Sequence, residues 1–158
     1  MNSENKFYQR FVIKSASILF FLGLLTGIYV TIVATGKMEG NLSASLAAHL
    51  NGIIGSLIIL SLILIIPYTK YGHTYKVIMI AMFIVSNYAN WIITLIKSYL
   101  QVVGLEIIEN SISNNLIHIL LVVMVVIPSL TGAIMWILGV TSLKTSSKMN
   151  IKRMLFID

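Results

Sequence analysis

Two sets of side chains stand inside long apolar stretches of the sequence, at spacings that could support chemistry. The first set is Ser45, His49, Gly52 and Ser56, and the second is Asn87, Asn90, Trp91 and Thr94. At 100° per residue, the members of each set share one face of a helix. A neutral imidazole is the commonest metal ligand among side chains, whereas carboxamides and hydroxyls form hydrogen bonds. His49 is therefore a candidate metal ligand, and the second set is suited to holding a bound molecule.

Composition excludes several other kinds of site. The sequence has no cysteine, its one aspartate is Asp158, and its glutamates lie outside the apolar stretches. Paired-carboxylate acid–base chemistry within those stretches and a Ser-His-Asp triad are therefore excluded. Neither a Gly-rich phosphate loop nor a dinucleotide-binding motif is present.

The elements that carry both sets are predicted to be transmembrane helices. Of the 158 residues, 58% are hydrophobic and 10% are charged, whereas soluble domains have about 25% charged residues. A membrane-crossing helix needs about 20 apolar residues, and four stretches supply them. We expect an all-α integral membrane protein, one domain over residues 1–158, with spans at about 14–35, 46–67, 76–98 and 117–141.

The distribution of basic residues predicts the orientation of these spans. With a cytoplasmic N-terminus, nine basic residues face the cytoplasm and only Lys37 and Lys97 lie outside. This bias follows the positive-inside rule. We expect an up-down-up-down bundle in the cytoplasmic (inner) membrane, with both termini cytoplasmic and residues 142–158 as a basic tail. The net charge of +6 thus reflects topology and does not indicate nucleic-acid binding.

Local features refine this picture. Gly23 and Gly27, like Gly52 and Ser56, are spaced to let another helix approach closely. Pro128 is expected to kink the fourth span because it removes a backbone hydrogen bond. The outer segment QVVGLEIIENSISNN (residues 101–115) mixes apolar and acidic residues, and a short interfacial helix is expected there.

The depths of the two sets predict a shared polar pocket. From a rise of 1.5 Å per residue, His49 lies about 5 Å below the outer end of its helix, and Asn90 and Trp91 lie about 9–10 Å below theirs. Polar side chains in lipid usually face a bundle interior or a cavity. Simpler roles stay open: interhelical hydrogen bonds for the asparagines, interfacial anchoring for Trp91, and an interfacial position for His49. In a small membrane bundle the natural metal for His49 is haem iron.

The sequence has two further histidines. His118 near the outer end of the fourth span is either a second axial ligand or a contact to lipid headgroups. His73 lies in the cytoplasmic loop, and no role is assigned to it.

Three motifs resemble those of a known family. FLGLLTGIYV, AAHLNG and NYANWIITL, in this order, resemble the hydroxylaminobenzene mutase family and its relative styrene oxide isomerase, over about residues 18–141. The resemblance implies a small four-helix membrane enzyme that rearranges one substrate without net redox change. It also implies haem b on His49, a homotrimer, and ferric iron acting as a Lewis acid that opens an epoxide.

The resemblance implies that His49 is the iron ligand and that Asn90 belongs to the pocket wall. Together with the two polar helix faces, this predicts Gly52, Asn87 and Trp91 around the cofactor and Asn90 and Thr94 at the reacting molecule. The chain departs from the family pattern at three positions: Gly55 replaces an asparagine of the relatives, Thr94 a tyrosine of the isomerase, and Asn51 a glutamate of the mutase.

We therefore expect a haem-dependent isomerase or mutase acting on a small hydrophobic epoxide or hydroxylamine-like compound, within the lipid bilayer. Two alternatives remain at this point. One is a non-enzymatic haem protein for electron transfer or sensing, with His49 and His118 as paired ligands. The other is a structural or interaction protein in which both sets only pack helices.

Overall fold

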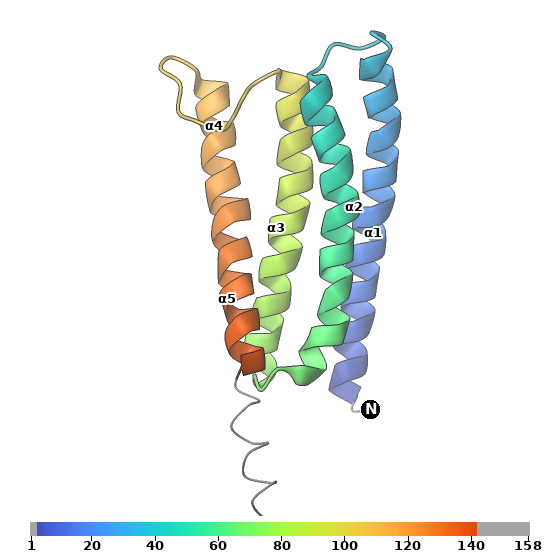
Figure 1. Ribbon diagram of the computed structural model, residues 1–158, viewed down its shortest axis with the longest axis vertical. Helices are drawn as coiled ribbons and strands as arrows, with labels where there is room; N and C mark the ends of the chain where they lie inside the picture. The colour runs from blue at the N-terminus through green and yellow to red at the C-terminus, as the bar shows by residue number, and fades with distance from the viewer. Residues whose placement is uncertain (1–2, 142–158) are drawn as a thin grey trace, which may run out of the picture.

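The protein is an all-helical chain within residues 3–141, the part that the computed structural model describes (Figure 1). The helices are α1 (Ser3–Ala34), α2 (Leu42–Ile65), α3 (His73–Leu100), α4 (Ile112–Leu121) and α5 (Ile127–Thr141). A 3₁₀ turn, η1 (Ile66–Tyr68), extends α2, and a π-helical turn, η2 (Val122–Val126), joins α4 to α5. The predicted tail, residues 142–158, lies outside the described residues.

Four helical segments are long and apolar enough to cross a membrane. They are Phe7–Ala34, Leu42–Tyr68, His73–Leu100 and Ile112–Thr141. The predicted all-α fold with four spans is confirmed. The segments run alternately up and down, so that the beginning of α1 and the end of α5 lie at the same end of the molecule (Figure 1).

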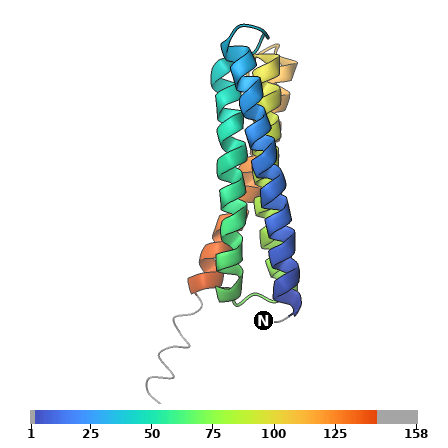
Figure 2. The same ribbon diagram turned by 90° about the vertical axis from the view of Figure 1, so that its right-hand side faces the viewer.

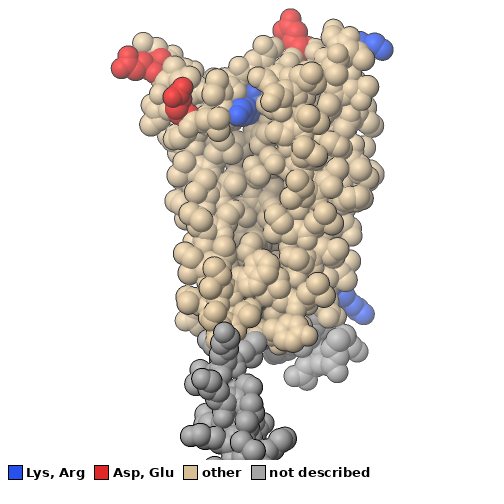
Figure 3. Space-filling model, in the orientation of Figure 1, with Lys and Arg blue, Asp and Glu red and all other residues tan. Residues whose placement is uncertain are grey.

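Charged side chains gather at the two ends of the molecule. On the face drawn in Figure 3, lysine, arginine, aspartate and glutamate appear only near the top and bottom of the described residues. The surface between them is built from uncharged side chains, and large apolar ones are widely exposed along the spans. An uncharged middle band is what contact with lipid hydrocarbon requires.

The helices extend beyond the predicted boundaries because hydrophobicity limits the membrane span but does not end a helix. α1 continues through Arg10 and Lys14 to Ser3. α2 begins at Leu42 because Asn41 caps it, accepting a hydrogen bond from Ala44 N at 3.0 Å. An Asn side chain at this position satisfies a backbone donor that the helix itself leaves free.

The prediction of a short interfacial helix in residues 101–115 is wrong. Residues 101–111 form a non-helical loop, and α4 already begins at Ile112. Two asparagines of α4 hold the loop backbone instead: Asn114 accepts from Gly104 N at 2.6 Å, and Asn115 accepts from Ile108 N at 2.8 Å. Gly104 has a φ of +63°, a left-handed conformation that glycine adopts without steric cost.

The helices pack in an order that matches the chain. α1 packs along α2, α2 against α3, and the fourth span, made of α4, η2 and α5, mainly against α3. Figures 1 and 2 show the fourth span beside α3, on the side away from α1. The main buried core fills the half of the molecule nearer the N-terminus, with Val12, Leu19, Ile59 and Met79 fully buried.

Gly23 of α1 and Gly52 of α2 form the closest helix crossing. A Cβ atom at Gly52 would lie 2.5 Å from Gly23 Cα, and one at Gly23 would lie 2.9 Å from Gly52 C. Two backbones can approach this closely only where both residues lack side chains. The predicted close approach of helices at these positions is confirmed.

The fourth span is irregular where Pro128 was expected to disturb it. The segment Val122–Val126 is π-helical, and Ile127 N–H bonds to Val122 O, five residues back. Proline lacks an N–H and collides with the preceding turn of a regular α-helix. The wider π turn ahead of Pro128 is a common way to accommodate such a break.

Candidate functional site

His49 lies in the seam between α1 and α2. Its ring is partly buried, and Nδ1 donates a hydrogen bond to the carbonyl oxygen of Gly23 at 2.7 Å. A carbonyl oxygen can only accept, so Nδ1 carries the proton. In the neutral imidazole Nε2 then has a free lone pair, and within residues 3–141 it has no hydrogen-bond partner. His49 thus presents the form of histidine that binds metals.

Gly27 makes room for the His49 ring. A Cβ atom at Gly27 would lie 3.1 Å from His49 Cε1 and 3.3 Å from Nδ1. The second glycine of the GLLTG motif therefore faces the imidazole and not another backbone. The two glycines have separate roles: Gly23 lets the helices touch and provides the acceptor, and Gly27 leaves space for the ring.

Trp91 reaches α1 on the other flank of the same seam. Its Nε1 donates to Thr26 Oγ1 at 2.9 Å, and Thr26 donates to Leu22 O at 2.8 Å. Around α1, Thr26 lies about 60° to one side of Gly23 and Gly27 about 40° to the other. The crossing at Gly23 and Gly52 therefore separates Trp91 from His49, although both residues contact α1.

A second polar group lies between α2 and α3. Asn51 Nδ2 donates to Thr94 Oγ1 at 3.2 Å, and Thr94 is buried. Asn87 donates to Phe83 O at 2.7 Å, and its side chain fills the space beside Gly55. A Cβ atom at Gly55 would lie 2.9 Å from Asn87 Oδ1. The carboxamide of Asn87 thus occupies the space that a side chain at position 55 would need.

Asn90 is partly buried, and its side chain forms no hydrogen bond to any residue of the described part of the chain. On α3 it lies about 40° from Thr94 and 60° from Asn87. It therefore adds an unpaired carboxamide to the Asn51, Thr94 and Asn87 group.

The predicted site residues fall on two sides of α2. Asn51 is about 200° from His49 around this helix, and no hydrogen bond joins His49 to Asn87, Asn90, Trp91 or Thr94 within residues 3–141. Within one chain, the structure therefore brings Thr94 and Asn87 to the side of α2 that carries Asn51 and Gly55, takes Trp91 to Thr26 of α1, and places His49 elsewhere.

All these groups lie deeper than the sequence-based boundaries suggested. Because α2 begins at Leu42 and α3 ends at Leu100, His49 is about 10 Å from the end of its helix, and Asn90 about 15 Å from the end of its own. Both remain in the half of the span nearer the loop at residues 35–41.

The other two histidines lie apart from His49. His118 is partly buried on α4, which packs mainly against α3 and η2. His73 is the first residue of α3, at the opposite end, where its Nδ1 and the Tyr8 hydroxyl are hydrogen-bonded and the two ring centroids lie 5.5 Å apart. His73 thereby fastens α3 to α1. His49 and His118 thus lie on helices that both pack against α3.

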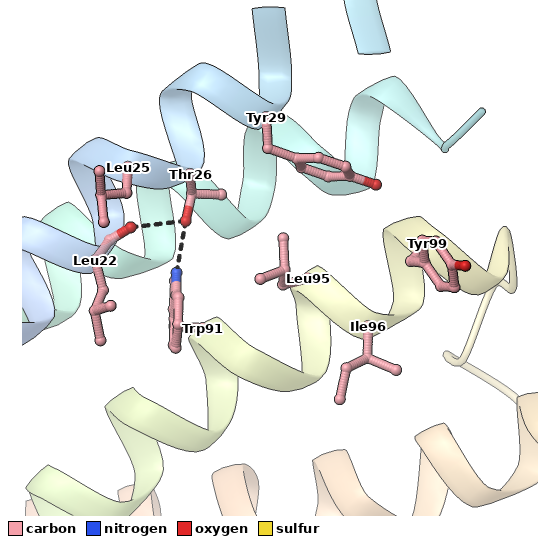
Figure 4. A pocket seen from close by; sticks show the side chains of 8 residues that line it. All are labelled: Leu22, Leu25, Thr26, Tyr29, Trp91, Leu95, Ile96 and Tyr99. Atoms are coloured by element: carbon pink, nitrogen blue, oxygen red, sulfur yellow. Dashed lines mark hydrogen bonds between the residues drawn. The ribbon is translucent and has the colours of Figure 1, made fainter. Parts of the chain in front are cut away.

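Two cavities border the α1–α2 seam. One, of about 440 Å³, opens between α1 and α3 on the Trp91 flank (Figure 4). The other, of about 320 Å³, includes Phe20, Ser56 and Leu57. Seven residues make nearly two helical turns, so Phe20 lies below Gly27 on one face of α1, and Ser56 lies below His49 on one face of α2. The smaller cavity therefore continues the His49 flank.

Residues 8–143 match the family model described as styrene oxide isomerase. The match spans all four membrane segments and includes the three motifs. This chain belongs to the styrene oxide isomerase family. The predicted resemblance is confirmed, and membership makes the chain a multi-pass membrane protein of an isomerase family. No curated protein matches the chain in the corresponding search.

Styrene oxide isomerase motifs thus map onto the two flanks described above, but three contributors were not predicted: Gly23 and Gly27 at His49, and Thr26 at Trp91. The Gly23 carbonyl is a backbone group and has no signature in a sequence. Gly27 was identified only as a packing glycine, because the spacing of small residues does not reveal what fills the gap. Thr26 is a single hydroxyl in an apolar helix, and a partner four residues back usually satisfies such a group.

Proposed function

We propose that this chain is a haem b-dependent membrane isomerase or mutase that rearranges a small uncharged aromatic compound, an epoxide or a hydroxylamine-like molecule. The observation that carries the proposal is the hydrogen bond from His49 Nδ1 to Gly23 O at 2.7 Å. Metal-binding histidines usually donate their second ring N–H to a carbonyl or carboxylate, which fixes the tautomer and the ring orientation. His49 has this arrangement with Gly23 O.

The surroundings of His49 give further support to the proposal of a haem. Haem iron in proteins is held by side chains such as histidine, and His49 Nε2 would hold it here. Gly27 leaves space next to the ring, and the apolar cavity beside Phe20 and Leu57 continues along the same flank. When bound, ferric haem would supply a Lewis acid for a substrate oxygen.

The side chains of the chain have distinct proposed roles. The Gly23 carbonyl holds the His49 ring in place, and the apolar flank excludes water, which strengthens any polar interaction with a substrate. Asn90 and Thr94 are proposed to contact the reacting molecule, and Asn87 stands in for the asparagine missing at Gly55. Asn51 orients Thr94 through the 3.2 Å hydrogen bond.

An assembly of copies is part of the proposal, a homotrimer as the resemblance implies. His49 and the group around Asn90 lie on different sides of α2, so one chain does not present them to one small molecule. In a cyclic assembly, the surface of one copy meets a different surface of the next. The His49 flank of one copy can thus meet the Asn90 side of its neighbour. The widely exposed apolar side chains of the spans leave surface for such contacts.

The absorption spectrum of the detergent-purified protein tests the cofactor. Produced with full haem supply, the protein is expected to carry b-type haem, and His49→Ala is expected to lose it. His118→Ala is the matched control, a partly buried histidine in the same half of the molecule, and should retain haem. A colourless wild-type preparation would refute the cofactor proposal, and loss of haem in both variants would favour paired ligands.

A product assay tests the reaction. Haem-loaded protein in detergent is expected to convert styrene oxide or an aryl hydroxylamine into an isomer of identical mass, without added reductant. Product with a changed mass would show net oxidation or hydrolysis and would contradict an isomerase.

A further inference from the structure

The cavity between α1 and α3 has boundaries and a lining of its own. Its volume is about 440 Å³, within the range of small-molecule sites. Eight side chains line it: Leu22, Leu25, Thr26, Tyr29, Trp91, Leu95, Ile96 and Tyr99. Figure 4 shows the three aromatic rings spread along its length, with Leu95 between Trp91 and Tyr99 on α3.

Hydrogen bonds already use the polar groups within this cavity. Trp91 Nε1 donates to Thr26, whose own proton goes to Leu22 O. At the other end Ser98 Oγ donates to Asn41 O at 2.9 Å, so the Tyr29 hydroxyl must donate to Ser98 Oγ at 3.2 Å. Desolvating a charged ligand against such a lining would be costly. The interior therefore suits an uncharged, apolar ligand.

Tyr99 is the exception, and it lies at the mouth. Its side chain is 69% exposed, and its hydroxyl forms no hydrogen bond within the described residues. A ligand with an apolar ring inside and a small polar group at its outer end would meet this phenol. The polarity of the cavity therefore changes along its length, from an apolar interior to the Tyr99 hydroxyl at its mouth.

The length of the cavity favours a compact ligand over a lipid tail. Trp91 and Tyr99 are eight residues apart on α3, about 12 Å along the axis. The Trp91–Thr26 hydrogen bond links α3 to α1 at one end of the cavity (Figure 4). An extended phospholipid acyl chain is longer than this groove, whereas a molecule of one or two rings fits its length and volume.

We infer that the α1–α3 cavity is a second binding site, for a neutral aromatic molecule with one small polar group, whose ring contacts Trp91 and whose polar group reaches the Tyr99 hydroxyl. The site is separate from the His49 flank because the Gly23–Gly52 crossing lies between them. It does not depend on haem binding or on the proposed reaction.

Trp91 provides a direct readout. The chain has two tryptophans, so Trp136→Phe leaves Trp91 as the only indole. 4-Bromobenzyl alcohol is expected to quench this fluorescence saturably, because bromine quenches indole on contact. Leu95→Phe, which fills the cavity, should abolish saturable quenching. Leu100→Phe, about 140° away around α3, is the matched control and should leave quenching unchanged.

The hydroxyl of Tyr99 is tested by a difference between ligands. Tyr99→Phe is expected to weaken the binding of 4-bromobenzyl alcohol about 2- to 10-fold, because one hydrogen bond is lost. The binding of 4-bromotoluene, which has no hydroxyl, should be unchanged. Tyr68→Phe, an equally exposed tyrosine at 64% on α2's extension, is the control. Non-saturable quenching that Leu95→Phe does not alter would overturn the site. Quenching by phospholipids brominated on their acyl chains, undiminished by 4-bromobenzyl alcohol, would show a lipid tail there and also overturn it.

Discussion

At the residue scale, the position of the His49 ring depends on one carbonyl and one missing side chain. The bond to Gly23 O fixes which nitrogen is protonated, and Gly27 leaves the space in which the ring lies. Neither contribution comes from a side chain with chemistry of its own. The imidazole on α2 is oriented by the backbone of α1, and α1 itself packs against α2 and α3.

Gly27→Ala tests this orientation directly. The added methyl group would lie 3.1 Å from His49 Cε1, so the ring must move and its bond to Gly23 O is strained or lost. Loss of such a partner typically weakens metal binding about 10- to 100-fold. Titration of apoprotein with haemin should show this loss. Gly72→Ala, where a Cβ meets nothing within 4 Å, should bind like wild type, and unaltered binding in Gly27→Ala would contradict the role of the glycine.

The sequence identified His49, Thr94 and Asn87 as polar residues on helix faces, but it could not pair them. Helical periodicity places residues around one axis, and it does not say which neighbour each face meets. The contact of Asn87 with Gly55 and the bond of Asn51 to Thr94 depend on how α2 and α3 are rotated against each other. That rotation follows from packing across the whole interface.

At the element scale, the crossing of α1 and α2 positions both flanks of the site. The seam is narrowest at Gly23 and Gly52, with His49 on one flank and Trp91 on the other. Helix existence and number were predictable because four apolar stretches can only be buried in lipid as helices. The ends were not, because Asn41 and Asn114 act through caps and loop contacts that hydrophobicity does not register.

Gly52→Ala tests the crossing. A Cβ at this position would lie 2.5 Å from Gly23 Cα, so the helices must separate, and overpacking of this kind costs about 1–3 kcal/mol. Reversible unfolding in mixed detergent micelles should report the loss, together with a red-shifted Trp91 emission as Thr26 moves away. Ile54→Ala, on the exposed face of α2, should change stability by at most about 0.5 kcal/mol. Equal stabilities of the two variants would mean that α1 and α2 can move apart at this crossing without loss of stability.

At the scale of the whole molecule, charge at the two ends sets the orientation. Arg10, Lys14, Lys70 and Lys76 belong to the end at which α1 begins, and Lys37 and Lys97 to the other. The positive-inside rule therefore predicts that the loop at residues 35–41 is outside. The alternation of the helices was predictable from short connections, and the structure agrees.

Cysteine labelling checks this orientation without background, since the chain has no cysteine. In intact cells, a membrane-impermeant maleimide is expected to label Met38→Cys and to spare Tyr75→Cys until the membrane is opened. Both side chains are exposed, at 44% and 59%, so access and not burial decides the result. The reverse pattern would place the termini outside.

Sharing of the site between copies is tested by mixing variants. His49→Ala and Asn90→Ala are each expected to be inactive alone. In a ring where each site takes His49 from one copy and Asn90 from the next, a random equal mixture restores about one quarter of the sites, because each required wild-type residue is present with a probability of about one half. Co-expressed, co-purified variants should therefore show about 25% of wild-type turnover, with haem on the copies that keep His49. Activity no higher than that of either variant alone would place both residues in the site of one chain. In that case α2 would have to rotate to bring His49 and Asn90 to the same site.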